Sequence, residues 1–347
     1  LDCDGCFTEL VRVSTSSVNG VLGMIDTTVY PNDDYAVRVT AFDVNGQGRT
    51  EGVVISIQGQ VKPGQFTLEI TDISIPTRSL PIEIVRRYDS LKRDDLNAFG
   101  FGWALLAANP DLRESVRDET LPYSPISLYP LYVGARVYLN DPDGYRVGFT
   151  FDAELERATF IGDLYFPLFK EDIGVFDQLE DNRAGIKVIV NNGEAFNPLV
   201  KLPYNPAQYR LTRRDGSVYI YDQVFGLQQI IDQFSNTVTF SENAITHSDG
   251  TVITLQRDDL GRVATISSTS GVLAAYTYDQ AGNLATVTDA ENLTTTYLYY
   301  EDPAHALRAI IGPDGRILHQ AEFDEAGRMV RQSGGGDAGI DRTFDPG

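Results

Sequence analysis

Residues 278–284 read Tyr-Asp-Gln-Ala-Gly-Asn-Leu, and copies of this heptapeptide recur in the C-terminal part of the chain. Residues 323–329, Phe-Asp-Glu-Ala-Gly-Arg-Met, match it with an aromatic residue, Asp and Gly in the same places. Residues 257–263 match with Arg in the aromatic place, and residues 221–227 form a looser copy with one extra residue before Gly. A degenerate copy is expected around Tyr300-Glu301-Asp302. The chain therefore contains an internal repeat, which is typical of an array of small structural units.

Each copy of the repeat predicts one β-hairpin. The Asp side chain is expected to accept hydrogen bonds from backbone N–H groups of the turn, and the Gly three residues later supplies a positive φ. The aromatic residue is expected to stack on the equivalent aromatic residue of the neighbouring hairpin. Because an isolated hairpin is only marginally stable in water, adjacent copies should pair into one continuous sheet. The residues assigned to this structural motif are Tyr221, Asp222, Gly226, Asp258, Gly261, Tyr278, Asp279, Gly282, Phe323, Asp324 and Gly327.

The rest of the chain also predicts strands. Apolar and polar residues alternate with period two in many segments, such as residues 35–40 (Tyr-Ala-Val-Arg-Val-Thr) and 66–70 (Phe-Thr-Leu-Glu-Ile). Asp-Gly and Asn-Gly pairs, which favour tight hairpins, separate these segments, whereas helical periodicity is scarce. The fold class is therefore predicted to be all-β and mostly antiparallel.

The first 60 residues predict the C-terminal part of a β-sandwich. Strands are expected at 35–42 and 53–58, with a turn at 43–48 between them. This succession resembles the closing strands of immunoglobulin-like or fibronectin type III-like modules. Residues 59–64 would be the linker to the next region.

The heptapeptide copies resemble the YD repeats of RHS-repeat proteins, whose pattern is Tyr-Asp, two residues, Gly, one residue, Leu. Three further stretches carry the same resemblance. They are Arg87-Tyr88-Asp89-Ser90 followed by residues 99–103 (Phe-Gly-Phe-Gly-Trp), residues 140–151, and Arg257–Arg262. The resemblance covers roughly residues 63–347 and implies a bacterial or archaeal RHS protein, related in architecture to toxin-complex shells and teneurins.

In that family the repeats coil as a β-ribbon into a hollow shell, which encloses a C-terminal toxin or serves as an adhesion scaffold. The resemblance thus implies an antiparallel β-hairpin ribbon that follows the sandwich. Three domains are expected: residues 1–60, the end of the sandwich; residues 63–210, which start the ribbon; and residues 211–347, the YD repeats, cut in mid-repeat. The Asp-Pro-x-Gly element of self-cleaving members is missing, because Asp345-Pro346-Gly347 is a fragment of a repeat turn. Autoproteolysis is therefore not predicted.

Composition excludes several classes of partner. The 347 residues carry 28 Lys and Arg against 49 Asp and Glu, a net charge of -21, which argues against nucleic acid. The apolar content of 42% is enough for a core. No apolar run reaches the ~18 residues that a membrane helix needs. We expect no membrane span in this segment, which we interpret as part of a longer polypeptide.

Two groups of residues could carry chemistry near the N-terminus. Cys3 and Cys6 form a Cys-x-x-Cys motif that could be a disulfide, a pair of free thiols or part of a metal site. Asp43, Asn45 and Gln47 alternate as in a calcium loop, although the same residues suit an ordinary Asn-Gly hairpin turn. No metal site is predicted beyond this calcium candidate, and no cofactor is implied.

The histidines and the single tryptophan receive structural interpretations. His247, His305 and His319 lie in separate hairpins or loops and are expected to be ordinary turn or surface residues. Trp103 could be a sugar-stacking platform, but the flanking glycines favour a buried plug where the sheet begins to curl. No catalytic residue is predicted.

The function predicted from the sequence is that of a non-enzymatic structural segment of a large secreted or cell-surface RHS/YD-repeat protein. Its β-shell would enclose or scaffold a toxin cargo. The alternative is an adhesin or filament-forming surface protein that binds glycan or other copies of itself. The expected partners are the remainder of the same polypeptide, including further repeats and a C-terminal toxin, and other copies or a cell-surface glycan or receptor.

Overall fold

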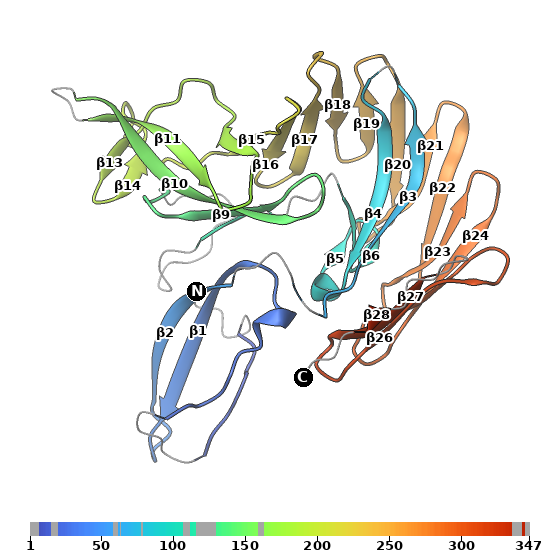
Figure 1. Cartoon of the computed structure of the whole chain (residues 1–347), viewed down its shortest axis with the longest axis horizontal. Helices are drawn as coiled ribbons and strands as arrows, with labels where there is room; N and C mark the ends of the chain where they lie inside the picture. Colours follow the sequence, from blue (N-terminus) through green and yellow to red (C-terminus); the bar gives the residue numbers. More distant parts are fainter. Residues whose placement is uncertain are drawn as a thin grey trace.

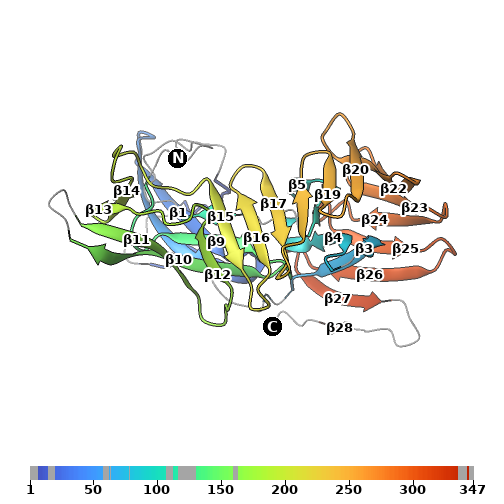
Figure 2. The ribbon, with the colours of Figure 1, turned by 90° about the horizontal axis from the view of Figure 1, so that it is seen from above.

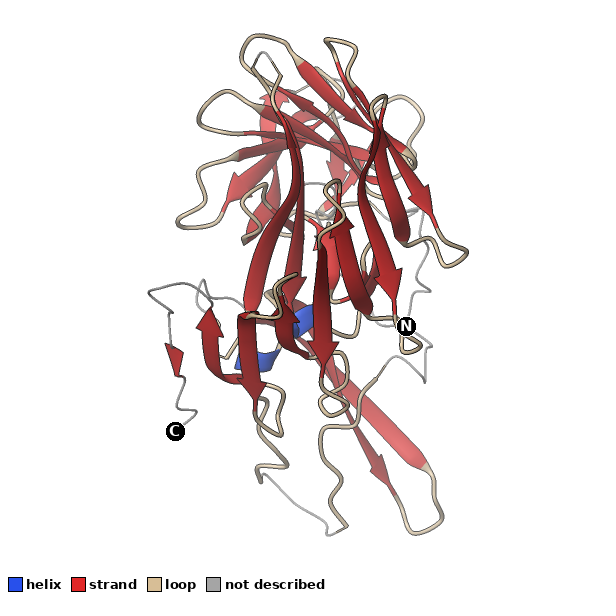
Figure 3. Cartoon of the chain, turned by 90° about the vertical axis from the view of Figure 1, so that its right-hand side faces the viewer, coloured by secondary structure: helices blue, strands red, loops and turns tan. Residues whose placement is uncertain are grey.

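The computed structural model describes residues 7–14, 20–57, 62, 64–77, 79–106, 112–115, 130–158, 163–334 and 342–343. Almost all of its regular elements are strands (Figure 3), so the predicted all-β class is confirmed. The helical elements in these residues are two three-residue 3-10 turns, η1 (Thr27–Val29) and η2 (Ser90–Lys92). Neither is long or apolar enough to cross a membrane.

The main sheet is an antiparallel ribbon of nineteen strands, which follow one another in chain order because short turns join most of them. Figure 2 shows these strands side by side along the molecule. The first strands of the ribbon are β8 (Arg113–Glu114), β9 (Arg136–Asn140), β10 (Arg146–Arg157), β11 (Leu164–Glu171) and β12 (Gln178–Asp181). It continues through β15 (Gln208–Thr212), β16 (Val218–Asp222), β17 (Gly226–Ile231), β18 (Thr237–Phe240), β19 (Ala244–His247), β20 (Val252–Arg257) and β21 (Val263–Ser268). It ends with β22 (Gly271–Tyr278), β23 (Leu284–Asp289), β24 (Thr294–Tyr299), β25 (Leu307–Ile311), β26 (Ile317–Phe323), β27 (Met329–Gly334) and β28 (Arg342–Thr343).

The ribbon curves strongly. In Figure 1 it forms an arch from β10 and β11 over β16 and β17 to β26 and β27. Its strand order is that of a closed barrel. Among the described residues, however, every register joins strands that are neighbours in the chain order, and none joins β28 to β8. We therefore treat the two ends of this sheet as ends of a ribbon.

A separate small sheet lies under the arch (Figure 1). It contains β3 (Thr67–Ile75), β4 (Ile82–Asp89) and β7 (Trp103–Leu105), and the short hairpin β5 (Leu96–Asn97) and β6 (Gly100–Phe101) lies beside it in the chain. We call the described residues of 64–106 the plug. The sequence predicts that residues 63–210 start the ribbon, whereas the plug forms its own sheet and the ribbon begins with β8. Period-two alternation predicts a strand but does not say which sheet the strand joins.

Two smaller hairpins complete the described fold. β13 (Ile189–Asn191) pairs with β14 (Glu194–Phe196). Near the N-terminus, β1 (Asp33–Phe42) pairs with β2 (Gly48–Ile57) over ten residues, from Asp33 opposite Ile57 to Phe42 opposite Gly48. Both predicted strands of this segment are present, although β2 begins at Gly48 rather than Val53. The two form a sheet of their own, and the wider sandwich stays a prediction.

The molecule has two hydrophobic cores. The first lies inside the early ribbon and includes Phe149, Phe151 and Tyr209. The second joins the plug to the repeats, with Ile84, Tyr88 and Trp103 on one side and ribbon residues from Val238 to Met329 on the other. The apolar face of the repeat strands is thus buried against a segment that lies far earlier in the chain.

Candidate functional site

The repeat turns use their Asp side chains as backbone hydrogen-bond acceptors. Asp258 Oδ1 accepts from the N–H groups of Leu260 (3.0 Å) and Arg262 (2.9 Å), and Asp258 Oδ2 accepts from Arg262 Nε at 2.8 Å. Asp324 accepts from Ala326 and Arg328 in the same way. The glycine of the motif completes the turn. Gly261 has φ +80°, and its backbone N–H donates to the Asp258 carbonyl. Asp and Gly therefore fix one turn geometry in both copies.

The other copies differ in detail. Asp279 accepts from the N–H and the side-chain amide of Asn283, at 2.8 and 3.0 Å. Asp222, in the copy with the extra residue, accepts from Val224 and Phe225, and Gly226 has φ +72°.

The degenerate copy has a longer turn. Tyr299 lies opposite Leu307, as Tyr278 lies opposite Leu284. Tyr300 occupies the place of Asp, and its N–H donates to the Ala306 carbonyl at 2.9 Å. His305 occupies the place of Gly, with φ +60°. Its ring stacks on Phe101 of the plug with centroids 3.9 Å apart, and its Nδ1 lies 2.6 Å from Asn283 Oδ1.

The electrostatics of the turns favour ionised Asp. Partial burial alone would raise the pKa of Asp258 and Asp324. Hydrogen bonds from Arg262 and Arg328 and from the turn backbone more than offset this, so the pKa of both carboxyls is lowered. The carboxylates of these two copies thus stabilise their turns.

The aromatic residues of the repeats stack on different partners. The Arg262 guanidinium lies 3.9 Å from the centroid of the Tyr278 ring, where stacking on an aromatic residue was expected. Tyr278 also donates its hydroxyl to the Val263 carbonyl at 2.6 Å. Phe323 packs edge-on against Tyr300, with centroids 6.2 Å apart, but Tyr300 occupies the place of Asp, and the equivalent aromatic residue is Tyr299. The expectation is therefore wrong for Tyr278, because Arg262 of the preceding copy takes the partner's place.

The plug binds the same backbone position in three copies. The residue at the Leu place of the motif donates its N–H into the plug: Val263 to the Ala98 carbonyl at 2.8 Å, Leu307 to Tyr88 Oη at 2.9 Å and Met329 to the Gly64 carbonyl at 2.6 Å. Each of these residues directly precedes a shift in strand register, and a bulge of this kind disrupts the ladder locally. The plug therefore accepts hydrogen bonds from three backbone N–H groups that have no partner within the hairpins.

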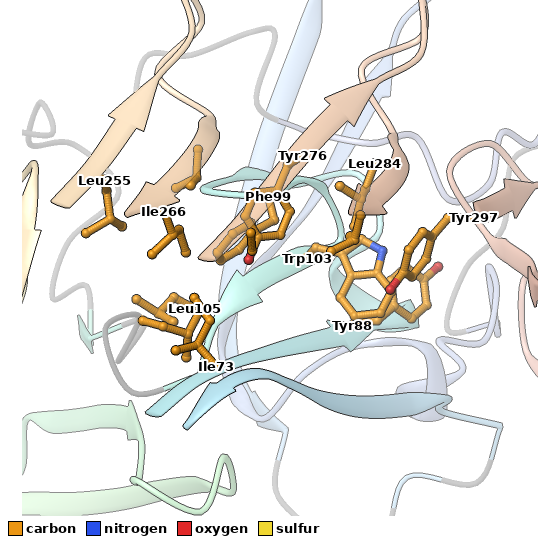
Figure 4. Packing of buried hydrophobic residues seen from close by; sticks show 14 of the residues in the cluster. Ile73, Tyr88, Phe99, Trp103, Leu105, Leu255, Ile266, Tyr276, Leu284 and Tyr297 are labelled. Atoms are coloured by element: carbon orange, nitrogen blue, oxygen red, sulfur yellow. The ribbon is translucent and has the colours of Figure 1, made fainter. Parts of the chain in front are cut away.

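Figure 4 shows apolar and aromatic residues at the interface between plug and repeats, and a buried guanidinium, that of Arg86, lies against two of them, Trp103 and Tyr297. Arg86 has no solvent exposure and pairs with Asp72 at 2.5 and 2.8 Å. It also donates to Tyr297 Oη at 2.8 Å, and Tyr276 donates its hydroxyl to Asp72 at 2.7 Å. The guanidinium carbon lies 4.9 Å from the centroid of Trp103 and 5.2 Å from that of Tyr297. We call these five residues the arginine cage.

The arginine cage keeps its charge. Burial alone would lower the pKa of Arg86, but Tyr297 and Asp72 raise it above the usual value. A buried charge without such partners would be strongly destabilising. Sequence reasoning missed this cluster, although Tyr276 and Tyr297 each stand two residues before a motif Tyr, on the same side of the strand.

Trp103 lies in the interior, as the plug interpretation predicted. Its ring has no exposed area and its Nε1–H donates to Tyr299 Oη at 2.9 Å. Gly100 and Gly102, which both precede it in the chain, have φ +89° and +73°. In Figure 4 the indole lies between Tyr88 of the plug and Tyr297 of the repeats. The alternative of an exposed sugar-stacking platform at Trp103 is therefore wrong.

Two of the three histidines also belong to this interface, which corrects their interpretation as ordinary turn or surface residues. His247 is 2% exposed, and its Nε2 lies 3.4 Å from Thr77 Oγ1 of the plug. Its Nδ1 accepts from the Asp249 N–H at 3.0 Å. His305 stacks on Phe101, as described above.

The remaining candidates lie at the N-terminus. Cys3 and Cys6 are outside the described residues. Asp43 Oδ1 accepts from the N–H groups of Asn45 (2.8 Å) and Gln47 (2.9 Å) in the turn between β1 and β2. The carboxylate of the calcium candidate thus caps a hairpin turn, and calcium binding stays a prediction.

Comparison with known families gives two matches. Residues 258–295 and 278–317 match the RHS Repeat family. Residues 60–113, which include the plug, match a family described as a domain of unknown function, DUF6531. The chain therefore contains RHS repeats.

Solved structures give a more distant likeness. The crystal structure of TcdB2-TccC3-TEV has 11% identity and a TM-score of 0.26, over 58% of this chain and 15% of that one. The crystal structure of TcdB2-TccC3 has 13% identity and a TM-score of 0.28, over 59% of this chain and 12% of that one. The chain thus spans a small part of the length of either, and the assignment to the family rests on the repeat segment alone. Curated proteins include no match.

Proposed function

We propose that this chain is a non-enzymatic structural segment of a large secreted or cell-surface RHS/YD-repeat polypeptide, in which it forms part of the wall of a β-shell. The shell encloses a toxin cargo or scaffolds it. The partners are then the other parts of the same polypeptide: further repeats and a C-terminal toxin.

One observation carries this proposal. The motif residues are engaged in holding the ribbon together and in holding the plug: Asp258 and Asp324 cap turns, and the donors of Val263, Leu307 and Met329 reach the plug. A wall needs such residues to be structural, because each hairpin is stable only when its neighbours and the concave face are covered. The plug supplies that cover for the repeats that it contacts.

Limited proteolysis of the complete polypeptide tests the proposal. If the ribbon walls off a cargo, a C-terminal segment resists protease in the native state and is cleaved once urea unfolds the wall. Trp103→Ala, which should loosen the plug, is expected to make that segment sensitive at lower urea concentration. Equal sensitivity of the C-terminal segment in native and unfolded protein would contradict enclosure.

The second candidate is an adhesin whose surface binds glycan. A cleft between the plug and the early ribbon favours this candidate, because Tyr145 and Phe176 are exposed in it.

A further inference from the structure

A large cleft lies between the plug and the early ribbon. Its volume is about 1730 Å³, and its walls come from the plug, the β9–β10 hairpin, the β11–β12 loop, the β15–β16 turn and residues before β1. Pockets for small molecules are usually about 300–1,000 Å³. The size of the cleft therefore favours an extended ligand of several units.

Four arginines that line the cleft pair with carboxylates, of which Asp143 and Asp177 also line it, whereas Glu69 and Asp33 lie outside the lining. The pairs are Arg87 with Glu69 (3.1 Å), Arg113 with Asp33 (3.6 Å), Arg146 with Asp33 (3.3 Å) and Arg213 with Asp177 (3.7 Å). Arg213 also pairs with Asp143. Acidic and basic side chains line the cleft in similar numbers, so no single sign of charge dominates the walls. A polyanion or a polycation would gain little there, whereas a neutral ligand rich in hydroxyl groups could bind both kinds of side chain.

Two aromatic rings stand exposed at the cleft. Tyr145 is 67% exposed and Phe176 is 60% exposed. Tyr145 belongs to a fixed turn, since its N–H donates to Asp141 Oδ1 and its carbonyl accepts from the Asp141 N–H, both at 2.8 Å. Phe176 is held by the Arg214 guanidinium, which lies 3.5 Å from the ring centroid. The fixed backbone at Tyr145 and the guanidinium contact of the Phe176 ring lower the entropic cost of stacking on a ligand.

Buried carboxyl groups add hydrogen-bonding capacity to the same walls. Burial raises the pKa of Asp141 to about 6, and it also raises the pKa of Asp177. The raised pKa makes the Asp141 carboxyl protonated in a larger fraction of molecules at mildly acidic pH, and a protonated carboxyl donates as well as accepts hydrogen bonds. Perturbed carboxyl groups in a cleft are typical of binding sites.

Three of the strands that line the cleft are paired on both edges, whereas β5, β7 and β8, which also contribute lining residues, each have one partner strand among the described residues. Extended peptides usually add to the free edge of a sheet. Here β4 pairs with β3 and β7, β9 pairs with β8 and β10, and β10 pairs with β9 and β11. These three strands offer side chains and turns to the cleft but no free edge.

We propose that this cleft binds a neutral oligosaccharide, with Tyr145 and Phe176 as stacking platforms and the paired Asp and Arg side chains as partners for sugar hydroxyl groups. The inference rests on the adhesive candidate above and is independent of enclosure by the shell.

A glycan array probed with the intact chain tests the proposal, followed by calorimetry with the oligosaccharide that is retained. Tyr145→Ala and Phe176→Ala should each weaken binding about tenfold. The matched control is Phe234→Ala, because Phe234 is 70% exposed, lies on a turn fixed by Asp232 and does not line the cleft. Its affinity should stay within about twofold of the wild-type value.

Three results would overturn the proposal: no glycan retained on the array, unchanged affinity in Tyr145→Ala and Phe176→Ala, or equal loss in Phe234→Ala. Far-UV circular dichroism of each variant establishes that it is folded. Enclosure of a cargo is tested separately by the protease experiment, so failure of the glycan experiment leaves that result standing.

Discussion

Arg86 donates a hydrogen bond to Tyr297 Oη at 2.8 Å across 211 residues of sequence. The donor lies on β4 of the plug and the acceptor on β24 of the repeats. Both side chains are buried, so water cannot replace this hydrogen bond if the plug and the repeats separate locally. The repeats and the plug should therefore unfold together.

Replacement of Arg86 by Met should strongly destabilise the chain. The substitution leaves Asp72 buried without its cation and Tyr297 without its donor, which should cost about 3–5 kcal/mol. The measurement is the free energy of unfolding in urea. The matched control is Arg87→Met, because Arg87 faces the opposite side and its partner Glu69 is 46% exposed. Equal losses in the two variants would show that the arginine cage has no special role.

Asp258→Ala should lower the free energy of unfolding by about 1–3 kcal/mol, because two backbone N–H groups and Arg262 lose their acceptor. Asp259, the next residue, is exposed. Asp259→Ala should therefore change stability by less than about 0.5 kcal/mol. Thermal or urea unfolding of the pair decides the matter, and a loss of similar size at both positions would contradict the assigned role of the motif Asp.

Substitutions at two glycines with positive φ can distinguish the cost of backbone strain from the cost of a steric clash. Gly261 has open space around it, so Gly261→Ala should cost only the strain of the left-handed region, about 1–2 kcal/mol. A Cβ on Gly100 would lie 2.8 Å from the Gly282 carbonyl oxygen and 3.1 Å from the Leu284 nitrogen. Gly100→Ala should therefore cost about 1–3 kcal/mol more. Urea unfolding that ranks the two variants equally would mean that the plug does not approach the repeats so closely.

The contribution of Asp141 to stability should depend on pH. Its pKa in the folded chain is raised to about 6 by burial, above the usual value of 3.8. Between these values the folded state binds more protons than the unfolded state, so stability falls as pH rises through this window. The free energy of unfolding of the wild type should thus increase, relative to Asp141→Asn, as pH is lowered from 7 to 4. A difference between the two proteins that stays constant over this range would contradict the burial of the carboxyl.

The repeat turns could be predicted from the sequence because their causes are local. Asp258 and Gly261 act within five residues, and the same residue types recur at the same spacing at Asp279 and Gly282 and at Asp324 and Gly327. The copy at Tyr299 could be located only roughly, since Tyr300 and His305 replace the Asp and the Gly. The positions of Tyr300 and His305 in the motif are evident only from the strand register and the backbone dihedral angles.

The plug and the arginine cage could not be predicted, because their contacts join distant segments. The bond from Leu307 to Tyr88 spans 219 residues, and period-two alternation shows that a side chain faces inward without naming its partner. His247 was misjudged for the same reason, since its burial depends on Thr77 of the plug. Trp103 was placed correctly because adjacent glycines mark a close approach of the backbone. The cleft could not be predicted either, because its lining residues come from several separate segments of the chain.

Fluorescence quenching of Trp103 tests the central claim most directly, because it is the only tryptophan in the chain. If the plug is docked in the concave face of the ribbon, the native emission is that of a buried indole and acrylamide quenches it poorly. The loss of that emission in urea then coincides with the loss of strand signal in far-UV circular dichroism. Efficient quenching in the native state, while the strand signal stays intact, would contradict the account.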